Sequence, residues 1–409
     1  MRYQTKAKEK KESIMNTELI HTPEGVRDIY GKEYANKLAI QNILHKQIHL
    51  YGYQDIQTPT FEYFDVFGKE IGTTPAKDLF KFFDSDGNIL CLRPDFTPSM
   101  ARCAAKYFVD EDLPLRLSYV GNTFSNTSLL QGKLKETTQM GAELMGDDSV
   151  EADGEMIAML IDALLKTGLE QFQVSVGEID YFKGICEDLN LSDEQEKVIR
   201  DYISNKNFFA VKEYLQSENI PEDKIDAIMA IEDLFGSVEM LEEAEKLSNH
   251  PLVQGAIERL KALYNVLCAY GVERYVSFDF GMLSSYQYYT GIIFKVYTLG
   301  IGDVVVKGGR YDKLLPYFGK NSPAIGFVIV IDDLMQALKR QKIEIAVKDN
   351  NMLIVYDGSG FLEALEEAKI HRKKGIDVQL VRYEASKSKC DYEAYAKNHG
   401  IHHVIYLMK

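Results

Sequence analysis

The sequence lacks any hydrophobic run near the length of about 18 residues that a membrane-spanning helix needs. Its N-terminal stretch is charged and contains no apolar segment, which excludes a secretory signal peptide. The five cysteines show no CxxC or Cys/His spacing of the kind that binds metals, and scattered single thiols suit a reducing compartment. These absences predict a cytoplasmic protein without a membrane anchor or a metal centre.

The sequence also has no excess of basic over acidic residues. Lys and Arg number 47 against 62 Asp and Glu, which gives a net charge of −15. Nucleic-acid binding depends largely on cations that neutralise phosphates. The balance therefore argues against an extensive RNA-binding surface, although it leaves room for a local basic patch.

The bulk composition is that of an ordinary globular protein. With 409 residues, 45% of them hydrophobic, the chain is long enough for two or three domains. We expect a disordered Lys-rich tail over residues 1–17, with Met15 as a candidate start. A core domain over 18–340 and a small domain over 347–409 follow.

The most informative stretch covers residues 115–146. Two β-prone segments, 115–123 and 137–145, flank a polar loop. Because side chains alternate across a strand, Gln139, Gly141 and Glu143 share one face. An amide, a bare backbone and a carboxylate suit a small polar ligand, and a sheet with one wet face is an equally good interpretation.

The other periodic segments predict an α+β fold. Its mixed, mainly antiparallel sheet is flanked by helices, with a purely helical insertion at about 190–271 and a small C-terminal α/β unit. The first helix should present Tyr34, Leu38, Leu44 and Ile48 near one face. The predicted elements are helices at 32–51 and 151–167, a hairpin at 80–92, strands at 53–58, 172–176, 275–280, 291–297 and 303–306, and a β-α-β-α-β unit from 352 to 407.

Four short segments occur in an order that resembles histidyl-tRNA synthetases, which are class II aminoacyl-tRNA synthetases. They are LRPDFT (92–97), QMGAE (139–143), YYTG (288–291) and GGRYD (308–312). Each is weak alone, and together they are specific. Residues 115–146 resemble motif 2 of that class and residues 323–334 resemble motif 3. The helix and strand that end at Pro59 resemble motif 1, which forms the dimer interface in the class.

The resemblance implies a set of histidine contacts. Its members are Asp95, Thr97, Gln139, Glu143, Tyr288, Tyr289 and Tyr311, with Arg310 as a substitute partner for the histidine carboxylate. Asp95 and Phe96 replace the Glu and Gly of the family pattern. A carboxylate suits an ammonium group, and Glu143 with a tyrosine hydroxyl can bracket the two imidazole nitrogens.

The positions that serve ATP in the synthetases are changed. Where those enzymes carry an Arg, this sequence has Ser125, Ser284 and Asp333, and a second acidic residue, Asp332, precedes the last of these. Adenylate formation relies on cations placed where phosphate charge develops, and losing one such donor costs about 10²–10³ in rate. The resemblance therefore implies no catalytic residues for adenylation.

A histidine site without an ATP site resembles the regulatory subunits of ATP phosphoribosyltransferase, which are paralogs of histidyl-tRNA synthetase. This resemblance implies a short-form catalytic subunit as partner, L-histidine as effector, self-association through the motif 1-like segment, and neither cofactor nor tRNA. Ser125 departs even from many of these proteins, which often keep an Arg there. A divergent histidyl-tRNA synthetase and a free-standing histidine sensor are the alternatives.

Overall fold

The computed structural model describes residues 20–68, 74–111, 114–126, 134–283, 289–347 and 351–408. They form two compact units, one built mainly from residues 40–344 and the other from residues 345–409 together with 29–39. Within the described ranges, no helix is both long enough and apolar enough to cross a membrane. The predicted tail over residues 1–17 lies outside the described residues.

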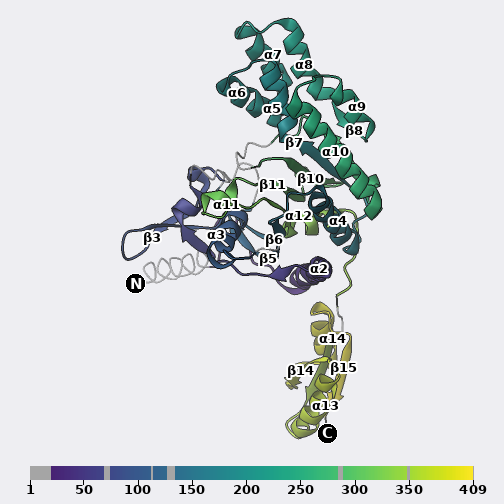
Figure 1. The fold of residues 1–409 in the computed structure, drawn as a ribbon. Coiled ribbons are helices and arrows are strands. Elements are labelled where there is room, and N and C mark those ends of the chain that lie inside the picture. Colours follow the sequence, from purple (N-terminus) through teal and green to yellow (C-terminus); the bar gives the residue numbers. More distant parts are fainter. Residues whose placement is uncertain are drawn as a thin grey trace, which may run out of the picture. The chain divides into compact units, whose positions relative to one another are not determined.

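The larger unit is organised around a nine-stranded mixed sheet (Figure 1). Among the described residues of this sheet, only two strand pairs are parallel, β1 with β5 and β7 with β9. The mainly antiparallel sheet confirms the predicted α+β class. In spatial order the strands are β1 (Gln54–Asp55), β5 (Leu115–Phe124), β6 (Glu136–Met145), β12 (Ala324–Val330), β11 (Val306–Arg310), β10 (Ile292–Thr298), β7 (Phe172–Glu178), β9 (Val276–Asp279) and β8 (Phe235–Gly236).

A second, three-stranded sheet precedes β5 in the chain. It consists of β2 (Phe61–Tyr63), β3 (Lys81–Phe83) and β4 (Ile89–Leu92), and the predicted hairpin joins β3 to β4. The Asp84 carboxylate closes that turn by accepting the backbone N–H groups of Asp86 and Asn88 at 2.9 and 2.8 Å. Helix α3 (Thr97–Tyr107), which the sequence did not predict, starts three residues after Pro94.

Helices pack on the large sheet along apolar faces. The predicted helices appear as α2 (Gly31–Leu50) and α4 (Val150–Lys166), and α10 (Pro251–Tyr270) packs against α4. The predicted face of α2 is wrong in part, because Tyr34 and Leu38 are exposed whereas Leu44 and Ile48 are fully buried. Leu44 comes six positions after Leu38, so at 3.6 residues per turn the two side chains lie about 120° apart around the helix axis.

The insertion lies at the end of the larger unit near β8 and β9 (Figure 1). It follows α5 (Ile179–Asp188) and contains α6 (Asp193–Ser204), α7 (Phe208–Ser217), α8 (Glu222–Met229) and α9 (Glu239–Glu245). A capping box of Ser192 and Gln195 starts α6. The segment is not purely helical, because β8 interrupts it to pair with β9 at the sheet edge.

The predicted strand at 303–306 is displaced in the structure. The observed strand, β11, covers Val306–Arg310 and includes both glycines of the GGRYD segment. A Cβ atom on Gly308 would lie 2.3 Å from the Phe294 ring of the neighbouring strand. The glycine therefore admits a large ring on β10 and does not break the strand.

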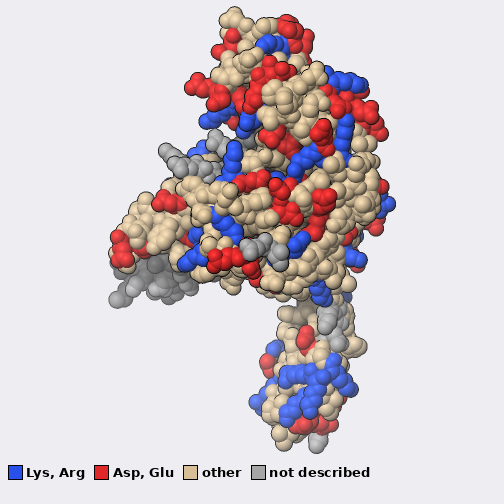
Figure 2. All heavy atoms as spheres, in the orientation of Figure 1, with Lys and Arg blue, Asp and Glu red and all other residues tan. Residues whose placement is uncertain are grey.

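The smaller unit has the predicted β-α-β-α-β order. Its three strands are all parallel, with β13 between β14 and β15. The elements are β13 (Asn351–Tyr356), α13 (Phe361–Lys373), β14 (Asp377–Arg382), α14 (Lys389–Asn398) and β15 (His403–Leu407). Lys and Arg side chains gather on the visible face of this unit, whereas both signs are interspersed on the larger one (Figure 2).

Candidate functional site

A small cavity of about 110 Å³ opens on one face of the large sheet. Residues that strand pairing places side by side form the floor of the cavity. Glu143 of β6 pairs with Gly326 of β12, which in turn pairs with Gly309 of β11. The described residues that line the cavity are Thr74, Pro94, Asp95, Thr97, Gln139, Glu143, Tyr289, Lys307, Gly308, Gly309, Tyr311, Gly326, Phe327 and Val328. Segments far apart in sequence thus enclose one polar space.

Glu143 lies at the centre of this cavity and is 1% exposed. Tyr311 donates a hydrogen bond to its Oε2 at 2.5 Å, and Thr97 donates to its Oε1 at 3.0 Å. Burial raises the pKa of Glu143 to about 8, while these two hydrogen bonds oppose the rise. The site therefore holds a carboxyl group that titrates in the neutral range. Because this carboxyl group is buried, the alternative interpretation of a sheet face exposed to solvent is wrong.

Glycine makes room for this carboxyl group. A Cβ atom on Gly326 would lie 1.6 Å from Glu143 Oε2, and one on Gly141 would lie 2.4 Å from the Tyr119 hydroxyl. A side chain at position 326 would displace the Glu143 carboxyl group, and one at position 141 would displace the Tyr119 hydroxyl. Gly326 therefore leaves the space that the carboxyl group of the cavity occupies.

The LRPDFT segment positions the second acid. Asp95 Oδ1 accepts the backbone N–H of Thr97 at 3.2 Å, at the start of α3. Burial raises the pKa of Asp95, and both the Thr97 N–H and the charge of Lys307 oppose that rise. Phe96, which replaces a glycine of the family pattern, stacks on Tyr119 with ring centroids 4.3 Å apart and lies under the Arg93 guanidinium. Its role is to pack beneath the site.

One buried polar atom at the cavity, Gln139 Oε1, has no hydrogen-bond partner among the described residues. Leaving such a group unpaired costs about 1–3 kcal/mol. A polar ligand in the cavity would remove that cost. The arrangement therefore favours a ligand with hydrogen-bonding groups over an apolar one.

Hydrogen bonds link the YYTG segment to the GGRYD segment. The Thr290 N–H donates to the Arg310 carbonyl at 2.9 Å, and the Thr290 hydroxyl accepts the Asp312 N–H at 2.9 Å. Asp312 Oδ1 in turn accepts the Ala324 N–H at the start of β12. These bonds hold Tyr289 and Tyr311 next to the same cavity.

The structure brings six of the eight predicted residues to the cavity: Asp95, Thr97, Gln139, Glu143, Tyr289 and Tyr311. Tyr288 lies outside the described residues. Arg310 does not line the cavity, because its guanidinium pairs with the buried Asp153 of α4 at 2.6 Å. Neighbouring positions of a strand point to opposite faces, so Arg310 and Tyr311 diverge.

Sequence reasoning missed Lys307. Among the described residues that line the cavity, Lys307 is the one cationic side chain. It stands two positions before Gly309 on β11, so strand alternation from the GGRYD segment could have found it.

One changed ATP position, Ser125, and the acidic neighbour of another, Asp332, have hydrogen-bond partners here. The Ser125 N–H donates to the Lys135 carbonyl at 2.8 Å. Asp332 Oδ2 accepts the Thr138 N–H at 2.7 Å, and Asp333 follows it in the first turn of α12 (Ile331–Arg340), where a helix favours negative charge. Ser284 lies outside the described residues. None of these three described side chains supplies a cation.

The acid at the cavity floor should impose a pH dependence on stability. Its pKa is about 8 in the folded protein against 4.5 when exposed, so its neutral form stabilises the fold below about pH 4.5. That contribution is lost as the pH rises toward 8. We expect the variant Glu143→Gln to gain stability relative to the wild type between pH 5 and pH 8.5, as measured by urea unfolding. Parallel pH profiles for the two proteins would contradict the buried-acid assignment.

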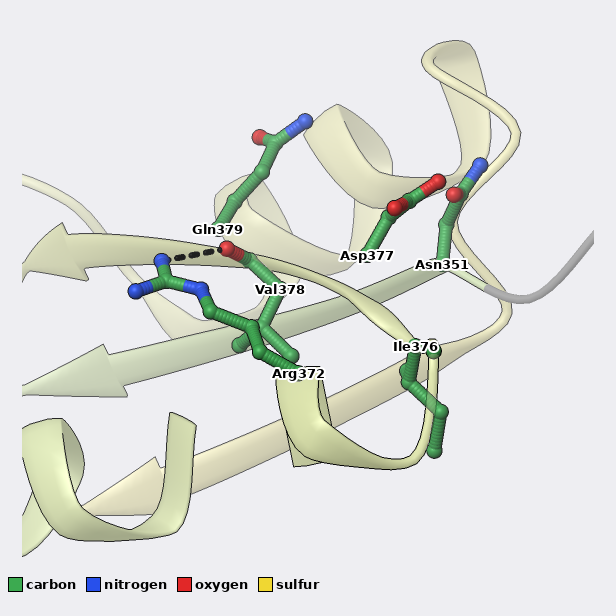
Figure 3. Close-up of a pocket in the computed structure, with 7 residues that line it drawn as sticks. Asn351, Arg372, Ile376, Asp377, Val378 and Gln379 are labelled. Atoms are coloured by element: carbon green, nitrogen blue, oxygen red, sulfur yellow. Dashed lines mark hydrogen bonds between the residues drawn. The ribbon is translucent and has the colours of Figure 1, made fainter. Parts of the chain in front are cut away.

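A larger hollow of about 530 Å³ lies on the smaller unit, where α13 meets the start of β14 (Figure 3). Its lining includes Asn351, Arg372, Asp377 and Gln379. Figure 3 shows the Arg372 guanidinium committed to the Val378 carbonyl, to which it donates at 2.8 Å. The hollow thus offers no converging set of charges comparable to the cavity on the large sheet.

Comparison with known proteins gives one consistent result. Residues 25–334 match the family model described as histidyl-tRNA synthetase. The ATP phosphoribosyltransferase regulatory subunit of Acetivibrio thermocellus is 40% identical over 361 residues, which cover 88% of this chain and 86% of that protein. The protein of the same name from Ruminiclostridium cellulolyticum is 37% identical over 95% of this chain and 92% of its own length.

Solved structures agree. One described as an ATP phosphoribosyltransferase regulatory subunit/histidyl-tRNA synthetase, from Bacillus halodurans C, matches with a TM-score of 0.86 and 32% identity over 95% of this chain and 98% of that one. Histidyl-tRNA synthetase from Nostoc sp. PCC 7120 matches with a TM-score of 0.79 at 18% identity, over 93% of this chain and 90% of that one, which supports the fold alone. The predicted class II synthetase-like fold is therefore confirmed.

Proposed function

The chain belongs to the family of ATP phosphoribosyltransferase regulatory subunits, and we propose that it makes this enzyme responsive to L-histidine. In this role it acts in histidine biosynthesis beside a separate catalytic subunit, the short form that lacks its own regulatory domain. The chain itself carries out no catalysis. One observation supports this proposal most directly: a polar cavity keeps acidic, hydroxyl and amide groups, while Ser125 and Asp333 stand where a synthetase places ATP-binding arginines.

The lining residues suit the three polar parts of histidine. Asp95 provides a carboxylate for the ammonium group, with Thr97 and Gln139 beside it. Glu143 meets one imidazole nitrogen, and Tyr289 or Tyr311 meets the other. Because Arg310 is committed to Asp153, we assign the histidine carboxylate to Lys307.

Histidine would act by shifting the populations of two arrangements of the hetero-oligomer. It must bind one arrangement of the hetero-oligomer more tightly than another, since equal affinity would shift nothing. The cavity draws residues from the LRPDFT turn, the motif 2 strand and the tyrosine segments, so a ligand there ties these segments together. Through this coupling, histidine bound in the cavity would affect the surface that contacts the catalytic subunit.

Lys307 gives a specific expectation. The change Lys307→Met should weaken L-histidine binding about tenfold, because a charge-assisted hydrogen bond is worth about 1.5–3 kcal/mol and this lysine is partly screened by solvent. Binding of L-histidinol, which has a hydroxymethyl group in place of the carboxylate, should hardly change. Isothermal titration calorimetry with both ligands measures the difference.

A matched control is Lys183→Met, at an exposed lysine of α5 whose partner is Glu187. It should leave both affinities at wild-type values. If Lys307→Met weakened histidine and histidinol equally, the carboxylate assignment would be wrong, although the cavity itself could still bind histidine.

Self-association and the lack of tRNA binding complete the proposal. The segment from α2 to Pro59 corresponds to the dimer-forming motif 1 of the synthetases, and we propose that it joins two copies of this chain. The net charge of −15 supports a protein that binds no tRNA. A divergent synthetase would differ by catalysing histidine-dependent ATP–pyrophosphate exchange.

The function is tested by reconstitution. A short-form catalytic subunit from the same organism is assayed for phosphoribosyl-ATP formation with and without this chain. The proposal expects a higher rate with the chain and none of the ATP–pyrophosphate exchange of a synthetase. An unchanged rate, together with failure to co-elute with the catalytic subunit, would favour the free-standing sensor.

A further inference from the structure

A cluster of three potential metal ligands lies away from the cavity, between α2 and β1. His45 Nε2 is 2.7 Å from Asp55 Oδ2, and His49 Nε2 is 3.0 Å from Asp55 Oδ1. The three ligand atoms all lie within 4.8 Å of one another. We propose that His45, His49 and Asp55 bind one divalent transition-metal ion of the Zn²⁺ type.

The spacing on the helix brings the two imidazoles together. His45 and His49 are four residues apart on α2, so they share one face of the helix, and their ring centroids are 4.0 Å apart. Buried Leu44 and Ile48 anchor that turn of the helix. The helix thus presents both rings with little freedom, which lowers the entropy lost when an ion binds.

The third donor is also held in place. Asp55 pairs with Ser118 in the ladder between β1 and β5, and the buried Ser118 hydroxyl donates to Asp55 Oδ1 at 2.9 Å. A hydrogen bond of this kind orients a metal-binding carboxylate and is a recurrent feature of metal sites. The serine therefore acts as a positioning residue for the proposed ligand set.

The donor atoms need little movement to meet an ion. With Zn–N and Zn–O distances of about 2.0–2.2 Å, donors in a tetrahedral site are about 3.3 Å apart, and here the two imidazole nitrogens lie 2.7 and 3.0 Å from the two Asp55 oxygens, with the three ligand atoms within 4.8 Å of one another. The side chains of His45, His49 and Asp55 are 37%, 38% and 52% exposed, so water can complete the coordination. Two imidazoles favour Zn²⁺, Ni²⁺ or Cu²⁺ over Mg²⁺ and Ca²⁺, which prefer oxygen donors.

A plain pair of surface His–Asp hydrogen bonds is the competing interpretation, and such pairs contribute little to stability. The two interpretations differ in what Zn²⁺ does to the protein. The i, i+4 histidine pair did not predict a metal site from the sequence alone, because the third donor comes from the following strand.

The test titrates Zn²⁺ into the chelator-treated full chain in competition with a chromophoric chelator. Wild type should bind one more Zn²⁺ per chain than His45→Gln, His49→Gln or Asp55→Asn, or should bind it at least tenfold more tightly. Ser118→Ala should weaken binding about tenfold. The control His21→Gln changes an exposed histidine outside the cluster and should behave as wild type. Zinc bound by the exposed Cys268 and Cys390 would contribute equally to every protein.

Thermal unfolding gives a second readout that does not depend on stoichiometry. Zn²⁺ should raise the melting temperature of wild type and His21→Gln and should leave that of the three ligand variants unchanged. A tenfold excess of Mg²⁺ should not displace the ion. Equal Zn²⁺ stoichiometry and affinity in wild type and ligand variants, or displacement by Mg²⁺, would overturn the proposal.

Discussion

Replacing Glu143 with glutamine should weaken L-histidine binding by more than about 30-fold. Truncating or neutralising one partner of a buried, hydrogen-bonded charge pair costs about 2–5 kcal/mol. Glu143 is 1% exposed and already accepts hydrogen bonds from Tyr311 and Thr97, so neither glutamine nor solvent can supply the ionised acceptor that a bound imidazole would favour. Glutamine conserves the volume and leaves Gly326 uncrowded. Calorimetric titration with L-histidine gives the affinity directly.

The same titration has a second readout. Because burial raises the pKa of Glu143 to about 8, this group is largely protonated at pH 7 in the free protein. A histidine imidazole N–H that donates to it favours the ionised form, so binding should release protons. The observed binding enthalpy of the wild type should then change with the ionisation enthalpy of the buffer, and that of Glu143→Gln should not.

A matched control lies on the same strand. Glu136 of β6 accepts a hydrogen bond from Asn122 at 2.7 Å and is only partly buried, and it does not line the cavity. Glu136→Gln should keep wild-type histidine affinity. If Glu143→Gln bound histidine as tightly as Glu136→Gln, histidine would have to bind elsewhere on the chain or its complex.

The largest expected loss of stability follows from Asp153→Ala. The Asp153 carboxylate is fully buried between Arg310 and Arg259, whose guanidinium groups approach its two oxygens at 2.6 and 2.5 Å. Removing it leaves Arg310, which is 3% exposed, as a buried cation with one longer ion pair, to Asp312 at 3.4 Å. Breaking a buried pair in this way costs about 3–5 kcal/mol of unfolding free energy.

Urea unfolding of Asp153→Ala and Glu155→Ala separates this effect from a general effect of mutating α4. Glu155 pairs with Arg116 at 3.2 Å, where both side chains are partly exposed, so its loss should cost about 1 kcal/mol. Asp153→Ala should also weaken histidine binding, because Arg310 directly precedes Tyr311 and their strand would lose its anchor. Equal destabilisation by the two variants would show that Arg310 does not depend on Asp153.

The sequence predicted local features of the site well and three-dimensional neighbours poorly. Strand alternation placed Gln139 and Glu143 on one face, and the structure has both at the cavity. The same rule, applied along residues 307–311, would have excluded Arg310 and selected Lys307. Two glycines in that stretch weaken the local strand signal, and the reason for one of them, Gly308, is the Phe294 ring of the neighbouring strand.

Other features depend on contacts that no local pattern encodes. Helix α3 begins beside Pro94 and Pro98, and its start is set by the Asp95 carboxylate and by packing of Phe96 on Tyr119. The order of the large sheet joins β7 in parallel with β9, although about a hundred residues separate the two strands. The sequence predicted a mixed, mainly antiparallel sheet without a strand order, because periodicity alone gives strands without their partners.

The most direct test of the regulatory account is a histidine inhibition curve. Phosphoribosyl-ATP formation by the short-form catalytic subunit is measured with wild-type chain, with Glu143→Gln and with Glu136→Gln, over a range of L-histidine concentrations. The account predicts that all three chains support the reaction, and that Glu143→Gln alone shifts the inhibition curve to much higher histidine concentrations. Identical inhibition curves for the three chains would contradict histidine sensing at this cavity.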